Sequence, residues 1–366
     1  MAEPLPRRLV GYGAYNLCFD KMLGRRQNAT DPDFFKTIRQ QLRLGKINLV
    51  RVICFRHSQK EDLPANRAIP LYAKTPTTPS QIVVNPAFLQ NLEALVESAQ
   101  QSNFWVQVSI FHYHAIATPD GRPVPGERPK PEVPELLPLA LRPDRSVGAC
   151  QRLKTFFNPN PAKPAQLSRQ KQLVAAIVGR LKGRPKVIYE IGNELRMDTA
   201  GCTAADNCQL AEWMNVIKTE ILRVDPAAHV GTSTGKQGPL AGDNEEEIFR
   251  TCAKRLVPSY FDFHSGEWLA ADLTTLRINE AVRRAKAYLG ITTVPPLIID
   301  DDGVRDSNRT LANIQKWSTA AFGQGLHYAT KQTYPNGGRD EDGNILDFNR
   351  PIIRALNEAA RVVPLP

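Results

Sequence analysis

Glu194 is the residue whose position best suits chemistry, because it directly follows an apolar run. The run is KVIYEIGN at 186–193, and its last residue, Asn193, places a carboxamide beside the acid. A buried strand here would carry Glu194 at its carboxyl end. Partial burial raises the pKa of a carboxyl group toward neutrality, so that the group can hold and release a proton. The pattern predicts a general acid–base, although a solvated glutamate before a helix is the alternative.

A second group of acids follows another apolar run, PLIIDDDG at 296–303. Regular strand alternation would send Asp301 to one side and its neighbours Asp300 and Asp302 to the other. Three adjacent acids repel one another, so at least one needs a raised pKa or a cationic partner. We predict that this group supplies the second carboxylate of a site. A plain acidic turn is the alternative interpretation.

Other polar residues lie within or directly after apolar runs. Arg51 sits inside INLVRVIC, and a buried arginine needs an acidic partner, either at a site or in a structural ion pair. His112 and His114 close a further run and would face one side of an extended strand. As a pair they raise the alternative of a metal-dependent hydrolase that also uses the Asp cluster. No third ligand stands out, so we expect no metal.

The elements that must position these residues follow one repeated pattern, a short apolar run and then a longer amphipathic segment. The runs, rich in Val, Ile, Tyr and Phe, are typical of strands buried on both faces of a parallel sheet. They are residues 9–16, 47–54, 104–111, 186–193, 228–235, 260–266, 296–303 and 325–332. Helices are expected at 31–45, 85–102, 166–183, 205–225, 243–256, 272–290, 307–323 and 350–361. Eight strand–helix units predict an α/β fold, a (β/α)8 TIM barrel.

The barrel is expected to form a single domain over residues 1–366, with long βα loops after strands 2 and 3. The third connection is Pro-rich, with eleven prolines between Pro119 and Pro164. We expect 114–165 to be an insertion that forms a semi-rigid wall at the carboxyl-terminal face of the barrel, rather than a linker between domains. Neither the Rossmann glycine fingerprint nor a phosphate-binding loop is present.

Composition narrows the choice of partners. The formal charge is +10, from 47 basic and 37 acidic residues, but the basic residues are scattered, so we expect no nucleic-acid partner. No apolar run approaches the roughly 20 residues that span a membrane. The sequence shows no signal peptide, and we expect a secreted protein if a leader was removed. Of the six cysteines, Cys202 and Cys208 share one loop and are candidates for a local disulfide, while Cys18 and Cys54 are expected to be buried thiols.

The segment YEIGNE, at the fourth of eight expected strands, resembles the retaining glycoside hydrolases of the (β/α)8 superfamily called clan A. This superfamily includes cellulases, mannanases and β-glycosidases. The resemblance implies that Glu194 is the acid/base and that Asn193 binds the sugar hydroxyl next to the reacting carbon. It further implies that Asp301 is the nucleophile and that Arg51 holds the nucleophile carboxylate. No cofactor is implied.

The resemblance also suggests further sugar contacts. They are His112 and His114 after strand three, His264 in strand six and Tyr328 in strand eight. Trp268 is a candidate stacking platform because aromatic faces pack on the apolar face of a pyranose ring, and an interface residue between helices is the alternative. Gly266 stands where the superfamily often has tyrosine, and Glu267 beside it is an alternative second carboxylate. The expected ligand is an oligosaccharide or polysaccharide.

Asp301 departs from the superfamily, which has glutamate at this position. Aspartate is shorter by about 1.5 Å. Retaining enzymes hold their carboxyl groups about 5–5.5 Å apart and inverting ones about 6.5–9.5 Å apart. The sequence thus leaves three outcomes open: a retaining glycosidase, an inverting one, or a carbohydrate-binding pseudo-enzyme.

Overall fold

The computed structural model describes eight strands and six helices of the chain. The described residues are 4–13, 47–54, 71, 82–113, 116, 147–160, 164–193, 195, 197, 201–234, 260–264, 297–300, 310–323, 325–331 and 349–363. The predicted helices at 31–45, 243–256 and 272–290 lie outside these ranges. So does nearly all of 114–146, so that most of the predicted wall is untested, as is the prediction of one domain.

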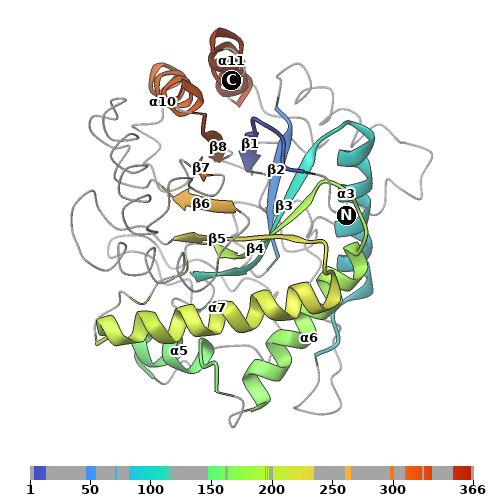
Figure 1. Cartoon of the computed structure of the whole chain (residues 1–366), viewed down its shortest axis with the longest axis vertical. Helices are drawn as coiled ribbons and strands as arrows, with labels where there is room; N and C mark the ends of the chain where they lie inside the picture. Colours follow the sequence, from blue (N-terminus) through green and yellow to red (C-terminus); the bar gives the residue numbers. More distant parts are fainter. Residues whose placement is uncertain are drawn as a thin grey trace, which may run out of the picture.

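Eight parallel strands form the centre of the molecule and close into a barrel (Figure 1). They are β1 (Val10–Gly13), β2 (Leu49–Ile53), β3 (Trp105–His112), β4 (Val187–Asn193), β5 (His229–Thr234), β6 (Tyr260–His264), β7 (Leu297–Asp300) and β8 (His327–Lys331). Each strand pairs with the next along the chain, and β1 pairs with β8 to close the ring. Every predicted apolar run therefore contains a strand, and the predicted parallel arrangement is confirmed.

Six helices are described around this barrel. They are α3 (Pro86–Gln101), α5 (Ala149–Phe156), α6 (Pro164–Leu181), α7 (Ala204–Val224), α10 (Leu311–Gly323) and α11 (Asn349–Val362). The predicted start of α3 is confirmed, since the Asn85 side chain accepts a hydrogen bond from the Ala87 backbone N–H and Pro86 fills the first turn. Helix α5 lies in the Pro-rich connection, where the sequence analysis expected no helix.

The barrel interior is filled at one end by a small apolar cluster, which we call the inner cluster. It consists of Leu9, Leu49, Trp105, Ile188 and Ala329. Side chains from β4 and β8, which are not neighbours, can meet in one cluster only inside the barrel. The strands approach so closely here that a Cβ on Gly11 would lie 2.7 Å from Cβ of Ala329. A larger, separate cluster packs the outer faces of the strands against the helices.

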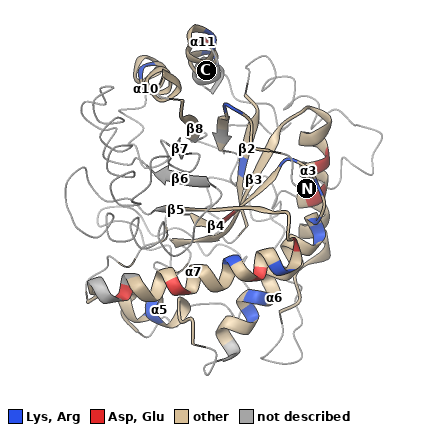
Figure 2. Ribbon diagram, viewed as in Figure 1, with Lys and Arg blue, Asp and Glu red and all other residues tan. Residues whose placement is uncertain are grey.

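The charged residues differ between the described helices: among the Lys, Arg, Asp and Glu coloured in Figure 2, α3 has only acidic residues, α6 only basic ones, and α7 both. Arg184 of the segment after α6 contacts Glu93 and Glu97 of α3, with Nη2–O distances of 2.8 and 2.6 Å. Such partly exposed pairs contribute little to stability. These ion pairs lie on the faces of α3 and α6 that are turned toward each other.

Helix α5 is anchored on α6 and α7 by an aromatic and amide joint. Trp213 of α7 packs against Phe157, with ring centroids 4.8 Å apart, and against Phe111 of β3 at 5.2 Å. The Trp213 indole N–H donates to Gln170 of α6 at 2.7 Å, and Gln170 donates to the Phe156 carbonyl at 2.8 Å. The Trp213 indole and the Gln170 amide are both hydrogen-bonded in this buried joint, so α5 is held beside the carboxyl end of β3.

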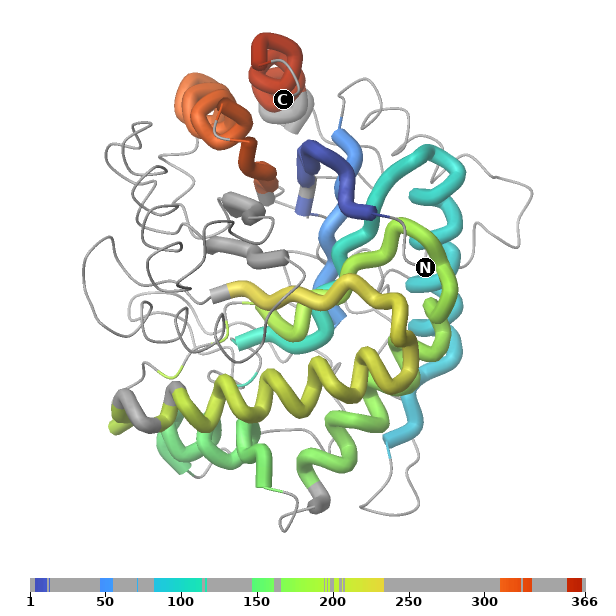
Figure 3. The backbone as a smooth tube through the Cα atoms, in the orientation of Figure 1, coloured from blue at the N-terminus to red at the C-terminus, as the bar shows by residue number. Residues whose placement is uncertain are grey.

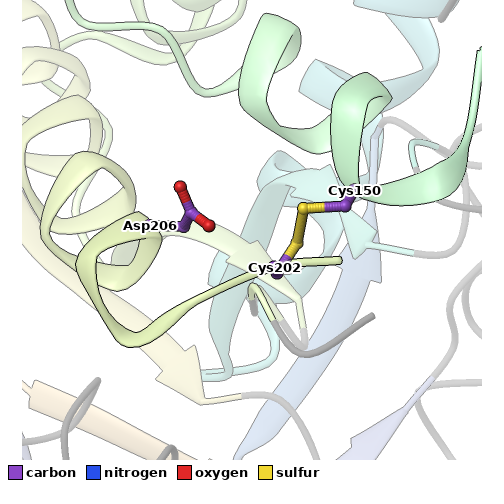
Figure 4. A group of neighbouring side chains, drawn as sticks. All are labelled: Cys150, Cys202 and Asp206. Atoms are coloured by element: carbon purple, nitrogen blue, oxygen red, sulfur yellow. A yellow bond between two sulfur atoms is a disulfide. The ribbon is translucent and has the colours of Figure 1, made fainter. Parts of the chain in front are cut away.

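A disulfide also ties α5 to the loop before α7, and it joins Cys150 to Cys202 (Figure 4). The predicted Cys202–Cys208 disulfide is therefore wrong, since Cys208 is a free thiol. Proximity in sequence was misleading because the fold brings α5 onto the same loop from 52 residues away. Cys54 is buried and takes part in no disulfide among the described residues, as predicted, and Cys18 lies outside them.

We expect removal of this disulfide to lower the free energy of unfolding by about 2–4 kcal/mol, because it closes a long loop in the unfolded chain. The variant is Cys150→Ser/Cys202→Ser, measured by urea unfolding with and without a reductant. Reductant should destabilise the wild-type chain and leave the double variant unchanged. The Cys208→Ser variant is the matched control and should behave as wild type. Equal stability of wild type and double variant under oxidising conditions would contradict the assignment.

The segment just before β1 contacts the end of α11 at the amino-terminal end of the barrel, where β1 lies beside β8 (Figure 3). Arg8 donates to the carbonyls of Ala360 and Val363 at 3.1 and 2.7 Å, and its guanidinium lies 4.9 Å from the Phe322 ring centroid. A cation at the last carbonyls of α11 is favourable to the helix. The first strand is thereby fastened to the last two helices.

His327 occupies the same end, where it is 4% exposed and its Nδ1 accepts a hydrogen bond from the Leu9 N–H at 2.9 Å. Burial, helped by the positive charge of Arg8, lowers the pKa of His327 to about 4. The unfolded chain has the ordinary histidine pKa of about 6.5, so between these values the unfolded state binds more protons. Stability present above about pH 6.5 is therefore lost as pH falls toward 4.

We expect this histidine to cost about 3 kcal/mol of stability between pH 7 and pH 4. His327→Asn keeps an acceptor for the Leu9 N–H but does not titrate, so its loss of stability with falling pH should be smaller by that amount. Urea unfolding of both proteins from pH 7 to pH 4 measures the difference. Parallel stability curves for the two proteins would refute the buried neutral imidazole.

Candidate active site

A layer of polar side chains lies next to the inner cluster, on the side toward the carboxyl ends of the strands. Arg51, Gln107 and Glu190 each follow a member of the inner cluster by two residues, namely Leu49, Trp105 and Ile188. Side chains two apart on a strand share a face, so these three also point inward. All three are fully buried.

The centre of this layer is an ion pair between Arg51 of β2 and Glu190 of β4. Nη2 of Arg51 lies 2.7 and 2.8 Å from the two carboxylate oxygens of Glu190, and Nε lies 3.1 Å from Oε2. Nε2 of Gln107 donates to the same Oε2 at 3.2 Å. Charged groups without exposure need such pairing to remain ionised, so the two residues stabilise each other's charge.

Asn193, the last residue of β4, is joined to this pair. Its Oδ1 accepts from Nη2 of Arg51 at 2.5 Å, and the residue is fully buried. Its Nδ2 is buried too, and no hydrogen-bond partner lies within reach among the described residues. A buried N–H without a partner is rare in native proteins and marks a place where a ligand can be bound.

The carboxyl end of β4 departs from regular alternation. Glu190 and Asn193 both reach Arg51 although they lie three residues apart, an odd spacing that a regular strand would direct to opposite faces. Gly192 lies between them, and a Cβ on it would come within 2.8 Å of the Leu195 side chain. The glycine in YEIGNE therefore leaves room for Leu195 beside the end of β4.

Two predicted histidines can be located in part. His112 ends β3, pairs in register with Asn193, and is 8% exposed, so it borders the same end of the barrel. His264 ends β6 and pairs with Asp300 of β7. Thus β3, β4, β6 and β7 all present a predicted residue at or next to their carboxyl ends.

Several predicted residues lie outside the described part of the chain. They are Glu194, Asp301, His114, Glu267 and Trp268. Their roles stay predictions.

The predicted sugar contact of Tyr328 is corrected. Tyr328 is fully buried in the outer cluster, and its ring packs edge-on against Phe322 of α10 at 6.4 Å. The neighbouring Ala329 is the residue of β8 that faces the barrel interior. Alternation along β8 thus assigns Tyr328 to the helix layer, away from the site.

Glu190 and Gln107 were not among the predicted site residues. Arg51 pairs with Glu190 in the described part of the chain, and its expected contact with Asp301 stays a prediction, because Asp301 lies outside the described residues. The sequence does contain a signal for Glu190, because an acid within the apolar run VIYEIGN needs a cation as partner when it is buried. Arg51, which also lies within an apolar run, is the cation that matches it.

One cluster of metal-ligand type occurs among the described residues, namely Cys150, Cys202 and Asp206 (Figure 4). Its sulfur atoms are joined in the disulfide. Oδ2 of Asp206 accepts from the backbone N–H and hydroxyl of Thr203 and lies 3.1 Å from Nζ of Lys154. Burial alone would raise the pKa of Asp206, but these bonds lower it below its usual value. The cluster therefore caps α7 and fastens α5.

None of the described helices is both long and apolar enough to cross a lipid bilayer.

Comparison with known proteins gives a match in structure alone. No protein-family model and no curated protein matches the chain. The chain is similar to the endo-1,4-β-mannanase from Rhizomucor miehei, with TM-score 0.62 and 11% identity over 99% of this chain and 97% of that chain. It is similar to GH5_18 from Streptomyces cattleya, solved with GlcNAc, with TM-score 0.61 and 14% identity over 100% and 83%. A glycoside hydrolase family 5 enzyme from Prevotella bryantii B14 gives 0.59 and 12% over 98% and 99%.

These likenesses extend over nearly the whole chain at low sequence identity, so they concern the fold. The resemblance first read from YEIGNE is confirmed at that level, and the chain has the fold of family 5 mannanases and related glycoside hydrolases.

Proposed function

We propose that the chain is a glycoside hydrolase that cleaves a β-glycosidic bond in an oligosaccharide or polysaccharide, without a cofactor. Glu194 is the general acid/base and Asp301 the nucleophile or second carboxylate. We further propose that helices follow the remaining strands and complete a (β/α)8 barrel. The likeness in fold to β-mannanases and other glycoside hydrolases makes β-linked mannosides the first substrates to test.

The observation that carries the proposal is the carboxamide of Asn193. Arg51 occupies its Oδ1, while its buried Nδ2 has no partner among the described residues. A sugar hydroxyl or ring substituent supplies the oxygen acceptor that this N–H lacks. Because Glu194 is the next residue, a sugar bound by Asn193 would have its reacting carbon close to the proposed acid.

The end of β7 supports the proposed second carboxylate. All eight strands are parallel, so the carboxyl ends of β4 and β7 lie at the same face of the barrel, the face that carries active sites in this architecture. Asp300 is the last residue of β7 and pairs in register with Ala329 of the inner cluster. Position 300 therefore deserves testing beside Asp301.

The remaining predicted residues complete the proposal. His112, His114 and His264 would bind sugar hydroxyls, and Trp268 would stack on a pyranose face, with Glu267 as the alternative second carboxylate. The disulfide favours an oxidising compartment, so we also propose that the protein is secreted.

The test is hydrolysis by the purified wild-type chain of a panel of aryl β-glycosides and β-1,4-linked oligosaccharides, mannosides included. We expect slow but catalytic release, unaffected by a chelator. Proton NMR of the first product formed gives its anomeric configuration, and retention or inversion reports whether the carboxyl groups are close or far apart. Replacing Asp300, Asp301 and Asp302 singly by Asn identifies the second carboxylate. Loss of activity with a chelator would favour the metal-dependent alternative instead.

A second candidate function is carbohydrate binding without cleavage. It is favoured by the shorter aspartate at the strand-seven position. Calorimetric titration with the same oligosaccharides separates the two functions, because a binding protein would bind them and release no product. Turnover that disappears in Glu194→Gln excludes this candidate.

A further inference from the structure

We propose that Glu190 is a positioning residue of the candidate site. It holds Arg51 so that Arg51 fixes the orientation of the Asn193 carboxamide, whose Nδ2 is then directed to the substrate. This inference rests on the proposed function, and it gives a role to a residue of the YEIGNE segment that the resemblance left without one. Glu190 acts through its neighbours and needs no contact with the sugar.

Both carboxylate oxygens of Glu190 accept hydrogen bonds from within the protein. Its Oε1 lies 2.7 Å from Nη2 of Arg51, and its Oε2 accepts from Nε and Nη2 of Arg51 and from Nε2 of Gln107. The donors come from β2 and β3, so the carboxylate joins three adjacent strands. With no exposed surface, it is an unsuitable proton donor or nucleophile but a rigid anchor.

Arg51, held in place by Glu190, in turn fixes the orientation of the Asn193 side chain. A carboxamide can present either its oxygen or its nitrogen to a neighbour, and the two orientations have nearly the same shape. Nη2 of Arg51 is a donor only, so at 2.5 Å it selects the orientation in which Oδ1 faces Arg51. Nδ2 must then lie on the other side. A donor directed to substrate before it binds lowers the cost of reaching the transition state.

The substitution Glu190→Gln would disturb the contact between Glu190 and Arg51. In Glu190→Gln one acceptor oxygen becomes an NH2 group, and this donor would face the donors of Arg51. Arg51 must then shift, and the amide of Asn193 loses its anchor. The substitution preserves size, so it tests charge and acceptor capacity rather than packing.

The kinetic test is a double-mutant cycle between Glu190→Gln and Asn193→Ala. We expect Glu190→Gln to lower kcat by about 10²-fold with a much smaller change in KM, because displacement of a catalytic contact by about 1 Å has effects of this size. In the Asn193→Ala background the same substitution should change kcat only a few-fold. His327→Ala, which also removes a buried polar group but at the opposite end of the barrel, is the control and should change stability without changing kcat.

Strictly additive effects in the cycle, or a wild-type kcat in Glu190→Gln, would overturn the proposal while leaving the glycosidase function standing. A wild-type chain without turnover would instead refute the proposed function, and a second measurement then decides about Glu190. That measurement is the side-chain amide NMR signal of Asn193, obtained with 15N-labelled asparagine and assigned by its loss in Asn193→Ala. We expect Glu190→Gln to move the signal and speed its exchange with water.

An Asn193 amide signal that is unchanged by Glu190→Gln would overturn the positioning role whether or not the chain is active. If Glu190→Gln fails to fold, Arg51→Met/Glu190→Met serves in its place, because both buried charges are removed together. The double variant should show the same shift and faster exchange of the Asn193 amide, and an unchanged signal counts against the proposal there as well.

Discussion

Replacement of Glu194 by Gln is expected to lower kcat about 10²- to 10⁴-fold on a glycoside with a poor leaving group, while the affinity for oligosaccharides is kept. General acid–base catalysis contributes rate factors of this size. An alkoxide leaving group must be protonated as its bond to the sugar breaks, and glutamine has no proton of suitable acidity. The shape of the side chain is preserved, so binding should not suffer.

The design compares two substrates in one variant. The dinitrophenolate of a dinitrophenyl glycoside leaves without protonation, so the variant should cleave this glycosidic bond at nearly the wild-type rate. An unactivated disaccharide needs the proton, so the variant should hardly cleave it. Glu212→Gln, at an exposed position on α7, is the matched control and should retain wild-type rates on both substrates. An equal loss of activity on both substrates would show that Glu194 is not the acid.

The barrel strands were predictable because each consists of a short, nearly continuous apolar run with turn residues around it. Such runs are what burial on both faces of a parallel sheet demands. Helix α5 was not predictable in the same way, because it has only eight residues and lies within a Pro-rich connection. It owes its stability to the joint with Trp213 and Gln170 and to the disulfide, and these contacts form only once the helix layer is assembled.

The candidate site was predictable to the extent that its residues end strands. Asn193 and Arg51 were identified because each has a polar side chain in or after an apolar run. Glu190 was not predicted because it lies within its strand and not at the end, and Tyr328 was assigned to the site because the direction of a side chain in β8 depends on register. Register came only from pairing with β1, which puts Ala329, and not Tyr328, inside the barrel.

Replacement of Arg51 by Met is expected to lower the free energy of unfolding by about 3–5 kcal/mol, since it leaves the carboxylate of Glu190 buried without a cation. Both side chains are fully buried, so water cannot compensate for the lost partner. Glu190→Met should also be destabilising, because it removes the carboxylate that pairs with the buried guanidinium of Arg51. Urea unfolding at pH 7 measures each variant.

The double variant Arg51→Met/Glu190→Met should recover at least about half of that loss, because replacing both members of a buried ion pair with apolar groups is often neutral or stabilising. Gln107 and Asn193 each lose one hydrogen bond in the double variant, which keeps the recovery below complete. If the pair serves stability, the double variant will be as unstable as the single ones. If it serves to hold Asn193, the double variant will be stable but catalytically poor, and a stable, fully active double variant would leave the ion pair without either role.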